Sequence, residues 1–242
     1  MSSSVTSLRP RAFVITGCGR SGTMFSSRVL TSLRVPCSHE KVFTGGVLES
    51  IELQPGTGES SWLAAPHLDL LPSGTLVVHQ IRHPLETIGS YLDSGWFRYR
   101  RRFQPLWKHC ARHLIRRPPS GRLRLLATVR TAVPEIFDDA SPVVRAACFW
   151  VRWNELVETE ARRHAHDYVR YRLEDLNVDG FDHLLGCIGV EPRKSVSSVL
   201  AEVGADVNAR PRRTRLTLDD LGPAADAVER LARSYGYEDD LK

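Results

Sequence analysis

Lysine is scarce in this chain. Only four of the 33 basic residues are lysines, so arginine supplies nearly all of the positive charge. A GC-rich genome produces that bias without any selection on function, so the bias identifies no partner. The formal net charge of +5 and the isoelectric point of about 9.1 favour anionic partners in general.

Long apolar runs and paired cysteines are also missing. Charge, glycine or proline interrupts every apolar stretch before it reaches the ~18–20 residues of a bilayer span. Residues 1–11 are polar, lack a signal-peptide pattern and are expected to be flexible. The five cysteines are widely spaced and never form a CxxC pair, which is typical of reduced thiols. These absences predict a cytoplasmic enzyme or binding protein, with one domain over residues 1–242.

The first ordered unit is expected to be a strand, a turn and a helix. Residues 12–16 form a short apolar run typical of a strand, and the glycine-rich turn Gly17-Cys-Gly-Arg-Ser-Gly-Thr23 follows at once. Met24–Leu33 then has apolar residues at helical spacing. This unit opens a parallel α/β sheet, so the chain is expected to adopt an α/β fold whose mainly parallel central sheet is flanked by helices.

Later segments continue the α/β pattern. The apolar run Gly74–Ile81 predicts a buried strand, and Pro84 suits the first turn of a helix over Leu85–Tyr91. The other expected elements are a long helix over Pro142–Arg163, a strand over Tyr168–Leu173, a loop over Thr44–Gly58, and helices near the C-terminus.

The turn after the first strand has the features of an anion site. Free backbone N–H groups and the partial positive charge of a helix N-terminus attract phosphate. Gly17, Gly19 and Gly22 let the backbone approach such a ligand closely. Glycines before a helix are also common for structural reasons, so the turn alone does not identify a phosphate site.

The same turn lacks two parts of a nucleoside triphosphate site. Gly17 to Gly22 fits the GxxxxG of a Walker loop, but Thr23-Met24 stands where Lys-Ser or Lys-Thr would follow. The lysine for triphosphate oxygens and the hydroxyl for Mg²⁺ are therefore missing. A Mg-ATP or Mg-GTP hydrolase is disfavoured, and Arg20 is the turn's only cation, which suits an anion handled without a metal.

Two segments together resemble the sulfotransferases that use 3′-phosphoadenosine 5′-phosphosulfate (PAPS). Gly19-Arg-Ser-Gly-Thr23 resembles that family's 5′-phosphosulfate loop, in which Lys or Arg precedes Ser-Gly-Thr. Arg82, at the end of the predicted strand, and Ser90, eight residues later on the following helix, resemble its 3′-phosphate motif. The resemblance implies a P-loop-type three-layer fold, with PAPS as cosubstrate and no metal. It implies a PAPS site made of Arg20, Ser21, Gly22, Thr23, Met24, Arg82 and Ser90.

Other segments match the family less closely. Tyr171–Leu176 resembles a strand that ends in Tyr-Glu-Asp-Leu, with Leu173 where tyrosine is usual. Met24 stands where a second threonine is common, so one hydroxyl contact is lost. Many members return a basic C-terminal loop to the 3′-phosphate, and a solvated loop is the other interpretation here. The basic residues at that place are Arg210, Arg212, Arg213 and Arg215.

The resemblance implies in-line transfer of a sulfuryl group to a hydroxyl or amine, with release of 3′-phosphoadenosine 5′-phosphate (PAP). Such a transfer needs a cation beside the leaving phosphate oxygen and a base beside the acceptor. Arg20 is the expected cation. The base is expected to be Glu40, as in the tyrosylprotein branch and several bacterial branches, or His67, as in the cytosolic branch. His39 is the third candidate, and because neighbours on an extended segment point opposite ways, only one of His39 and Glu40 is expected to enter the site.

Two alternatives remain at this point: a degenerate P-loop nucleotide kinase, and an Arg-rich nucleic-acid-binding or scaffold protein. The span Ser94–Pro134 supports the second, because it holds eleven basic residues and no acidic one. It shows no nucleic-acid motif, so no nucleic-acid partner is expected. The span follows the 3′-phosphate motif, where the resembling family builds much of its acceptor-side wall. The resemblance therefore implies that its interleaved arginines and aromatics hold a small-molecule or glycan acceptor with an anionic group. A solvated basic helix face is the other interpretation.

Overall fold

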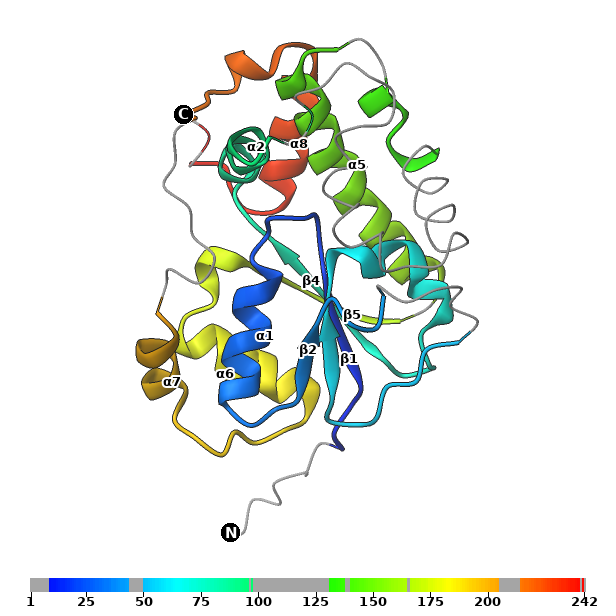
Figure 1. The fold of residues 1–242 in the computed structure, drawn as a ribbon, viewed down its shortest axis with the longest axis vertical. Coiled ribbons are helices and arrows are strands. Elements are labelled where there is room, and N and C mark those ends of the chain that lie inside the picture. The colour runs from blue at the N-terminus through cyan, green and yellow to red at the C-terminus, as the bar shows by residue number, and fades with distance from the viewer. Residues whose placement is uncertain are drawn as a thin grey trace.

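A five-stranded parallel sheet forms the centre of the protein (Figure 1). The computed structural model describes residues 9–43, 50–95, 97, 131–137, 140–164, 166–204, 214–239 and 241. Its strands lie in the order β2-β3-β1-β4-β5, and every neighbouring pair is parallel. Their bounds are Phe13–Thr16 (β1), Cys37–His39 (β2), Gly58–Ser60 (β3), Leu76–Ile81 (β4) and Asp167–Arg172 (β5). The predicted α/β class with a parallel sheet is confirmed.

Helices cover both faces of this sheet (Figure 1). One face carries α1 (Thr23–Ser32), α6 (Val178–Ile188) and α7 (Val196–Val203). The other carries α2 (Pro84–Asp93), α5 (Pro142–Arg163) and α8 (Ala225–Ser234), with the 3-10 helices η1 (Trp62–Leu70), η2 (Pro134–Phe137) and η4 (Asp219–Ala224). The short 3-10 helix η3 (Leu173–Asp175) follows β5.

The central strands supply side chains to two separate cores. In β1, Phe13 and Ile15 pack toward α1 and α6, whereas Val14 packs toward α5. All six residues of β4 are buried. Parallel strands covered on both faces are apolar along most of their length, which is why sequence patterning predicted β1 and β4.

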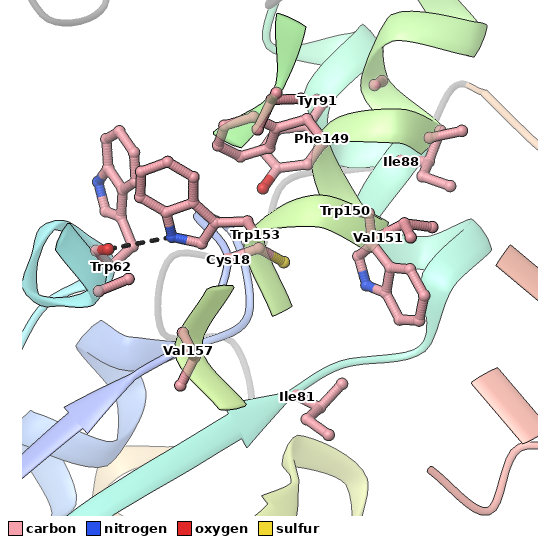
Figure 2. Close-up of a cluster of buried hydrophobic side chains, with 14 of the residues drawn as sticks. Cys18, Trp62, Ile81, Ile88, Tyr91, Phe149, Trp150, Val151, Trp153 and Val157 are labelled. Atoms are coloured by element: carbon pink, nitrogen blue, oxygen red, sulfur yellow. Dashed lines mark hydrogen bonds between the residues drawn. The ribbon is translucent and has the colours of Figure 1, made fainter. Parts of the chain in front are cut away.

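The core between the sheet and α5 is built from aromatic rings (Figure 2). The Trp153 ring stacks on Phe149 with 5.0 Å between centroids, and its Nε1 donates a 3.2 Å hydrogen bond to the Trp62 carbonyl. Cys18 of the glycine-rich turn lies fully buried in the same cluster. Burial raises the pKa of its thiol to about 12. The turn is therefore anchored to the core by a neutral side chain.

Most predicted elements are confirmed within a residue or two. Helix α1 follows the glycine-rich turn, Pro84 is the first residue of α2, and α5 spans Pro142–Arg163 as predicted. The three-residue strands β2 and β3 and the helix η1 were not predicted. The loop prediction over Thr44–Gly58 is corrected at its end, because Gly58 already belongs to β3.

Some predictions fall outside the described residues. They concern residues 1–8, most of Ser94–Pro134, and residues 205–213, which include Arg210, Arg212 and Arg213. Within the described ranges, no helix combines the length and apolar character needed to cross a membrane.

Candidate functional site

The glycine-rich turn and the Arg82 motif lie at the carboxyl ends of two neighbouring strands. Thr16, the last residue of β1, is in register with His79 of β4. Helix α1 leaves β1 toward one face of the sheet, whereas α2 leaves β4 toward the other (Figure 1). Open parallel sheets bind ligands where successive connections diverge in this way. The sheet therefore puts both predicted motifs at its expected binding edge.

The backbone of the glycine-rich turn has a shape that few residues tolerate. Arg20 and Gly22 have φ values of 70° and 90°, in the left-handed region. A Cβ on Gly17 would lie 2.1 Å from the Gln80 carbonyl oxygen, so the close approach of the turn to β4 requires glycine. A left-handed arginine is uncommon, and such conformations persist where the surroundings hold them in place.

Side chains of β4 and α2 hold the turn in that shape. The Gln80 amide donates a 2.7 Å hydrogen bond to the Ser21 carbonyl and accepts one of 2.5 Å from the Ser26 hydroxyl. The Tyr91 hydroxyl donates a 2.5 Å bond to the Gly19 carbonyl. Two buried side chains, Gln80 and Tyr91, thus fix the turn, and Ser26 of α1 orients the Gln80 amide, as a preorganised anion site requires.

The start of α1 offers hydrogen-bond donors to a ligand. The first N–H groups of an α-helix have no acceptor within the helix. Gly22 is the N-cap residue of α1 and has no side chain that could accept from the first N–H groups of the helix. The first turn of α1 also has no acidic residue. The Ser21 hydroxyl is buried and has no hydrogen-bond partner among the described residues. These groups suit phosphate oxygens. The predicted positions 21–24 thus form the start of α1 and the turn directly before it.

Arg20 and Ser90 join the two predicted motifs directly. Arg20 Nε donates a 2.9 Å hydrogen bond to Ser90 Oγ, across 70 positions of sequence. Arg82 Nη1 donates a 3.3 Å bond to the Arg20 carbonyl oxygen. The turn, the end of β4 and helix α2 therefore contribute to one cluster with two half-buried cations. Such a cluster favours a ligand with more than one anionic group.

Arg82 also lines a cavity of about 590 Å³ at the ends of β4 and β5. It meets the Glu86 carboxylate at 3.4 Å, whereas Arg172 holds Asp175 through bonds of 2.7 and 2.8 Å. Burial lowers the pKa of Arg82. With this loose carboxylate contact, Arg82 is better placed than Arg172 to bind an added anion. The other lining residues are His83, Glu86, Arg172, Leu173, Glu174 and Tyr237.

His39 and Glu40 lie at the end of β2. His39 Nε2 is 3.3 Å from the Thr23 hydroxyl, so this candidate base contacts the glycine-rich turn. Glu40 is half-buried, has a left-handed φ of 51°, and donates its backbone N–H to the Ser60 carbonyl at 3.2 Å. Both candidates therefore belong to one turn beside the start of α1.

His67, the other candidate base, lies in η1. It is buried, and its ring stacks on Phe43 with 6.1 Å between centroids. Phe43 comes shortly after Glu40 in the chain, so η1 packs near the segment that carries the other two candidates. The structure thus gathers His67 into the core beside that segment.

The C-terminal segment returns to the helix that carries Ser90. The Thr214 hydroxyl donates a 2.7 Å hydrogen bond to Asp93 of α2, and a Cβ on Gly89 would lie 3.0 Å from the Thr214 carbonyl. Arg215 follows and is exposed. Of the four predicted C-terminal arginines, Arg215 alone lies within the described residues.

Sequence reasoning missed three residues that shape the site: Gln80, Tyr91 and Tyr237. An amide inside the apolar strand β4 was a usable signal for Gln80, because a buried amide needs partners. Tyr91 and Tyr237 carried no local signal, since their roles depend on where α2 and the C-terminal segment pack.

No protein-family model, curated protein or solved structure matches this chain. The described residues also contain no group of three or more histidine, cysteine or acidic side chains placed to hold a metal ion. The functional assignment therefore depends on the geometry of the site and on its motifs.

Proposed function

We propose that this chain is a PAPS-dependent sulfotransferase with a P-loop-type α/β fold. One observation carries the proposal: the 2.9 Å hydrogen bond from Arg20 to Ser90, which joins the 5′-phosphosulfate motif to the 3′-phosphate motif. A nucleotide with phosphates at both positions needs two anion sites at a matching separation. The adjacent carboxyl ends of β1 and β4 are suited to supply them.

The residues present fit such a nucleotide. The N–H groups of Gly22, Thr23 and Met24, with the Ser21 hydroxyl, would hold its 5′ end, and we therefore name the glycine-rich turn over residues 17–23 the phosphate turn. Arg82 and Ser90 would hold its 3′-phosphate through charge-assisted and neutral hydrogen bonds. The donor set therefore serves both ends without a metal ion.

The reacting groups follow from the direction of charge movement. PAPS supplies a sulfuryl group, whose bond to the phosphate oxygen breaks as the acceptor oxygen or nitrogen bonds to sulfur. Arg20 stabilises the negative charge that develops on the leaving oxygen. Glu40 takes the proton that the acceptor loses, with His39 and His67 as the alternative bases. The acceptor is a small molecule or a glycan with a free hydroxyl or amine.

Calorimetry with PAP, Mg-ATP and Mg-GTP tests this proposal. PAP should bind more tightly than either triphosphate, because the turn lacks the lysine and the Mg²⁺-binding hydroxyl of a nucleoside triphosphate site. Tighter binding of Mg-ATP would overturn the proposal and favour a nucleotide kinase. Steeply salt-dependent binding to arbitrary duplex DNA, without PAP binding, would favour the Arg-rich nucleic-acid protein.

A further inference from the structure

Glu59 is a buried carboxyl at the centre of the three-residue strand β3. Its exposed fraction is 0%, and none of the ion pairs between described residues includes it. An unpaired carboxyl is costly to bury, so its hydrogen bonds should reveal what it supports. Burial raises the pKa of Glu59, in keeping with this position.

The side chain of Glu59 makes three hydrogen bonds with other described residues, and all three go to the turn over residues 38–42, which we name the base turn. The Ser38 hydroxyl donates to one carboxyl oxygen. The other oxygen accepts the backbone N–H of Lys41 at 2.6 Å and that of Val42 at 3.2 Å. One side chain therefore ties both ends of the base turn to β3.

The base turn needs such a clamp, because its central residue has a disfavoured backbone. Glu40 has a φ of 51°, a conformation that residues other than glycine seldom adopt. Its N–H bonds to the Ser60 carbonyl at 3.2 Å, next to Glu59 in the same strand. Strand β3 thus holds Glu40 from both sides. The base turn also contains His39, whose Nε2 lies 3.3 Å from the Thr23 hydroxyl of the phosphate turn.

We propose that Glu59 is a positioning residue that holds the base turn, and with it Glu40 and His39, in place beside the phosphate turn. The catalytic consequence rests on the proposed sulfotransferase function, whereas the clamp itself does not. A misplacement of a catalytic group by about 1 Å can lower the rate ~10²-fold. Loss of the clamp should therefore lower kcat more than it weakens PAP binding.

The first test needs no catalytic activity. Amide hydrogen exchange of the peptide over residues 37–43 is compared in the wild-type chain, Glu59→Ala and Glu59→Gln, with peptides from β4 and α5 as internal controls. Glu59→Ala should speed exchange at Lys41 and Val42 by at least about tenfold. Glu59→Gln should stay near wild type, because its amide oxygen still accepts both N–H groups. Unchanged exchange in Glu59→Ala would overturn the clamp.

The second test separates positioning from general stability. Glu59→Ala should lower kcat by ~10–10²-fold while the Kd for PAP stays within about threefold, and Glu59→Gln should recover most of the loss. In a Glu40→Gln background, Glu59→Ala should add less than about threefold, because it acts through a base already removed. An equal loss in both backgrounds, or a parallel loss of PAP affinity, would contradict positioning. Ser38→Ala, which removes one of the three bonds, should give a smaller loss of the same kind if Glu59→Ala fails to fold.

Failure of the proposed function gives a different pattern. If the chain binds no PAP and transfers no sulfuryl group while Glu59→Ala still frees Lys41 and Val42, the clamp stands and the sulfotransferase assignment falls.

Discussion

The side chains of Arg20 and Ser90 are joined by a 2.9 Å hydrogen bond between residues 70 positions apart. Arg20 belongs to a turn held by Gln80 and Tyr91, and Ser90 lies on α2, the helix that also carries Tyr91. The helix after β4 therefore fixes both the backbone of the phosphate turn and the direction of its cation. This linkage makes one site out of two motifs.

Loss of the Ser90 hydroxyl should weaken that site. Ser90→Ala should lower PAP affinity by about tenfold, because it removes a hydrogen bond to a charged group and a donor to the 3′-phosphate. Ser94→Ala, one turn further along at the C-cap of α2, is the matched control, since the Ser94 hydroxyl has no hydrogen-bond partner among the described residues. Calorimetry with PAP measures both. Equal effects of the two substitutions would contradict a specific role for Ser90.

The assignment of the base predicts a change in turnover without a change in binding. Glu40→Gln should lower kcat by ~10²–10⁴-fold and leave the Kd for PAP nearly unchanged, because the group acts in the transition state. His39→Ala and His67→Ala are measured beside it. Full activity in Glu40→Gln with a loss in either histidine variant would move the role to that histidine.

Gly17 should be sensitive to a single methyl group. Gly17→Ala places a Cβ 2.1 Å from the Gln80 carbonyl oxygen. The turn must then shift, so the free energy of unfolding should fall by about 1–3 kcal/mol and PAP binding should be lost. Gly186→Ala on helix α6 is the control, because a Cβ at that position would meet no atom within 4 Å outside the local helix backbone. It should raise stability by about 0.5–1 kcal/mol. Chemical denaturation of both variants checks the pair.

Sequence patterning predicted the two strand–turn–helix units around β1 and β4 because they are apolar and clearly terminated. It missed β3, which is only Gly58-Glu-Ser60 and has no apolar run. That strand lies between β1 and β2, so the contact from His39 to Thr23 depends on a sheet order that no local pattern contains. Glu59 escaped notice for the same reason, since its partners are set by strand pairing.

A buried histidine should make stability depend on pH. His79 is fully buried, and its ring nitrogens meet the Tyr168 hydroxyl at 2.6 Å and the Asn154 amide oxygen at 2.9 Å. Burial lowers the pKa of His79 from 6.5 to about 4. Between these values the unfolded chain binds more protons at this site than the folded chain, so the free energy of unfolding falls as pH drops.

That loss should be on the order of 3 kcal/mol between pH 6.5 and pH 4. Denaturation at several pH values, compared with His79→Gln, isolates this contribution from the carboxyl groups that titrate in the same range. A variant with the same pH slope as the wild-type chain would contradict the assignment to His79.

The most direct measurement of the central claim is a thermodynamic cycle between Arg82 and the 3′-phosphate. PAP and adenosine 5′-phosphate differ only in that phosphate, and the Kd of each is measured for the wild-type chain and for Arg82→Ala. The wild-type chain should prefer PAP by roughly 10–150-fold, the equivalent of about 1.5–3 kcal/mol for a charge-assisted contact. In Arg82→Ala most of that preference should be lost, and only the smaller part that the Ser90 hydroxyl supplies should remain. A wild-type chain with no preference for PAP, or a variant that keeps the full preference, would contradict a site built for a 3′,5′-bisphosphorylated nucleotide.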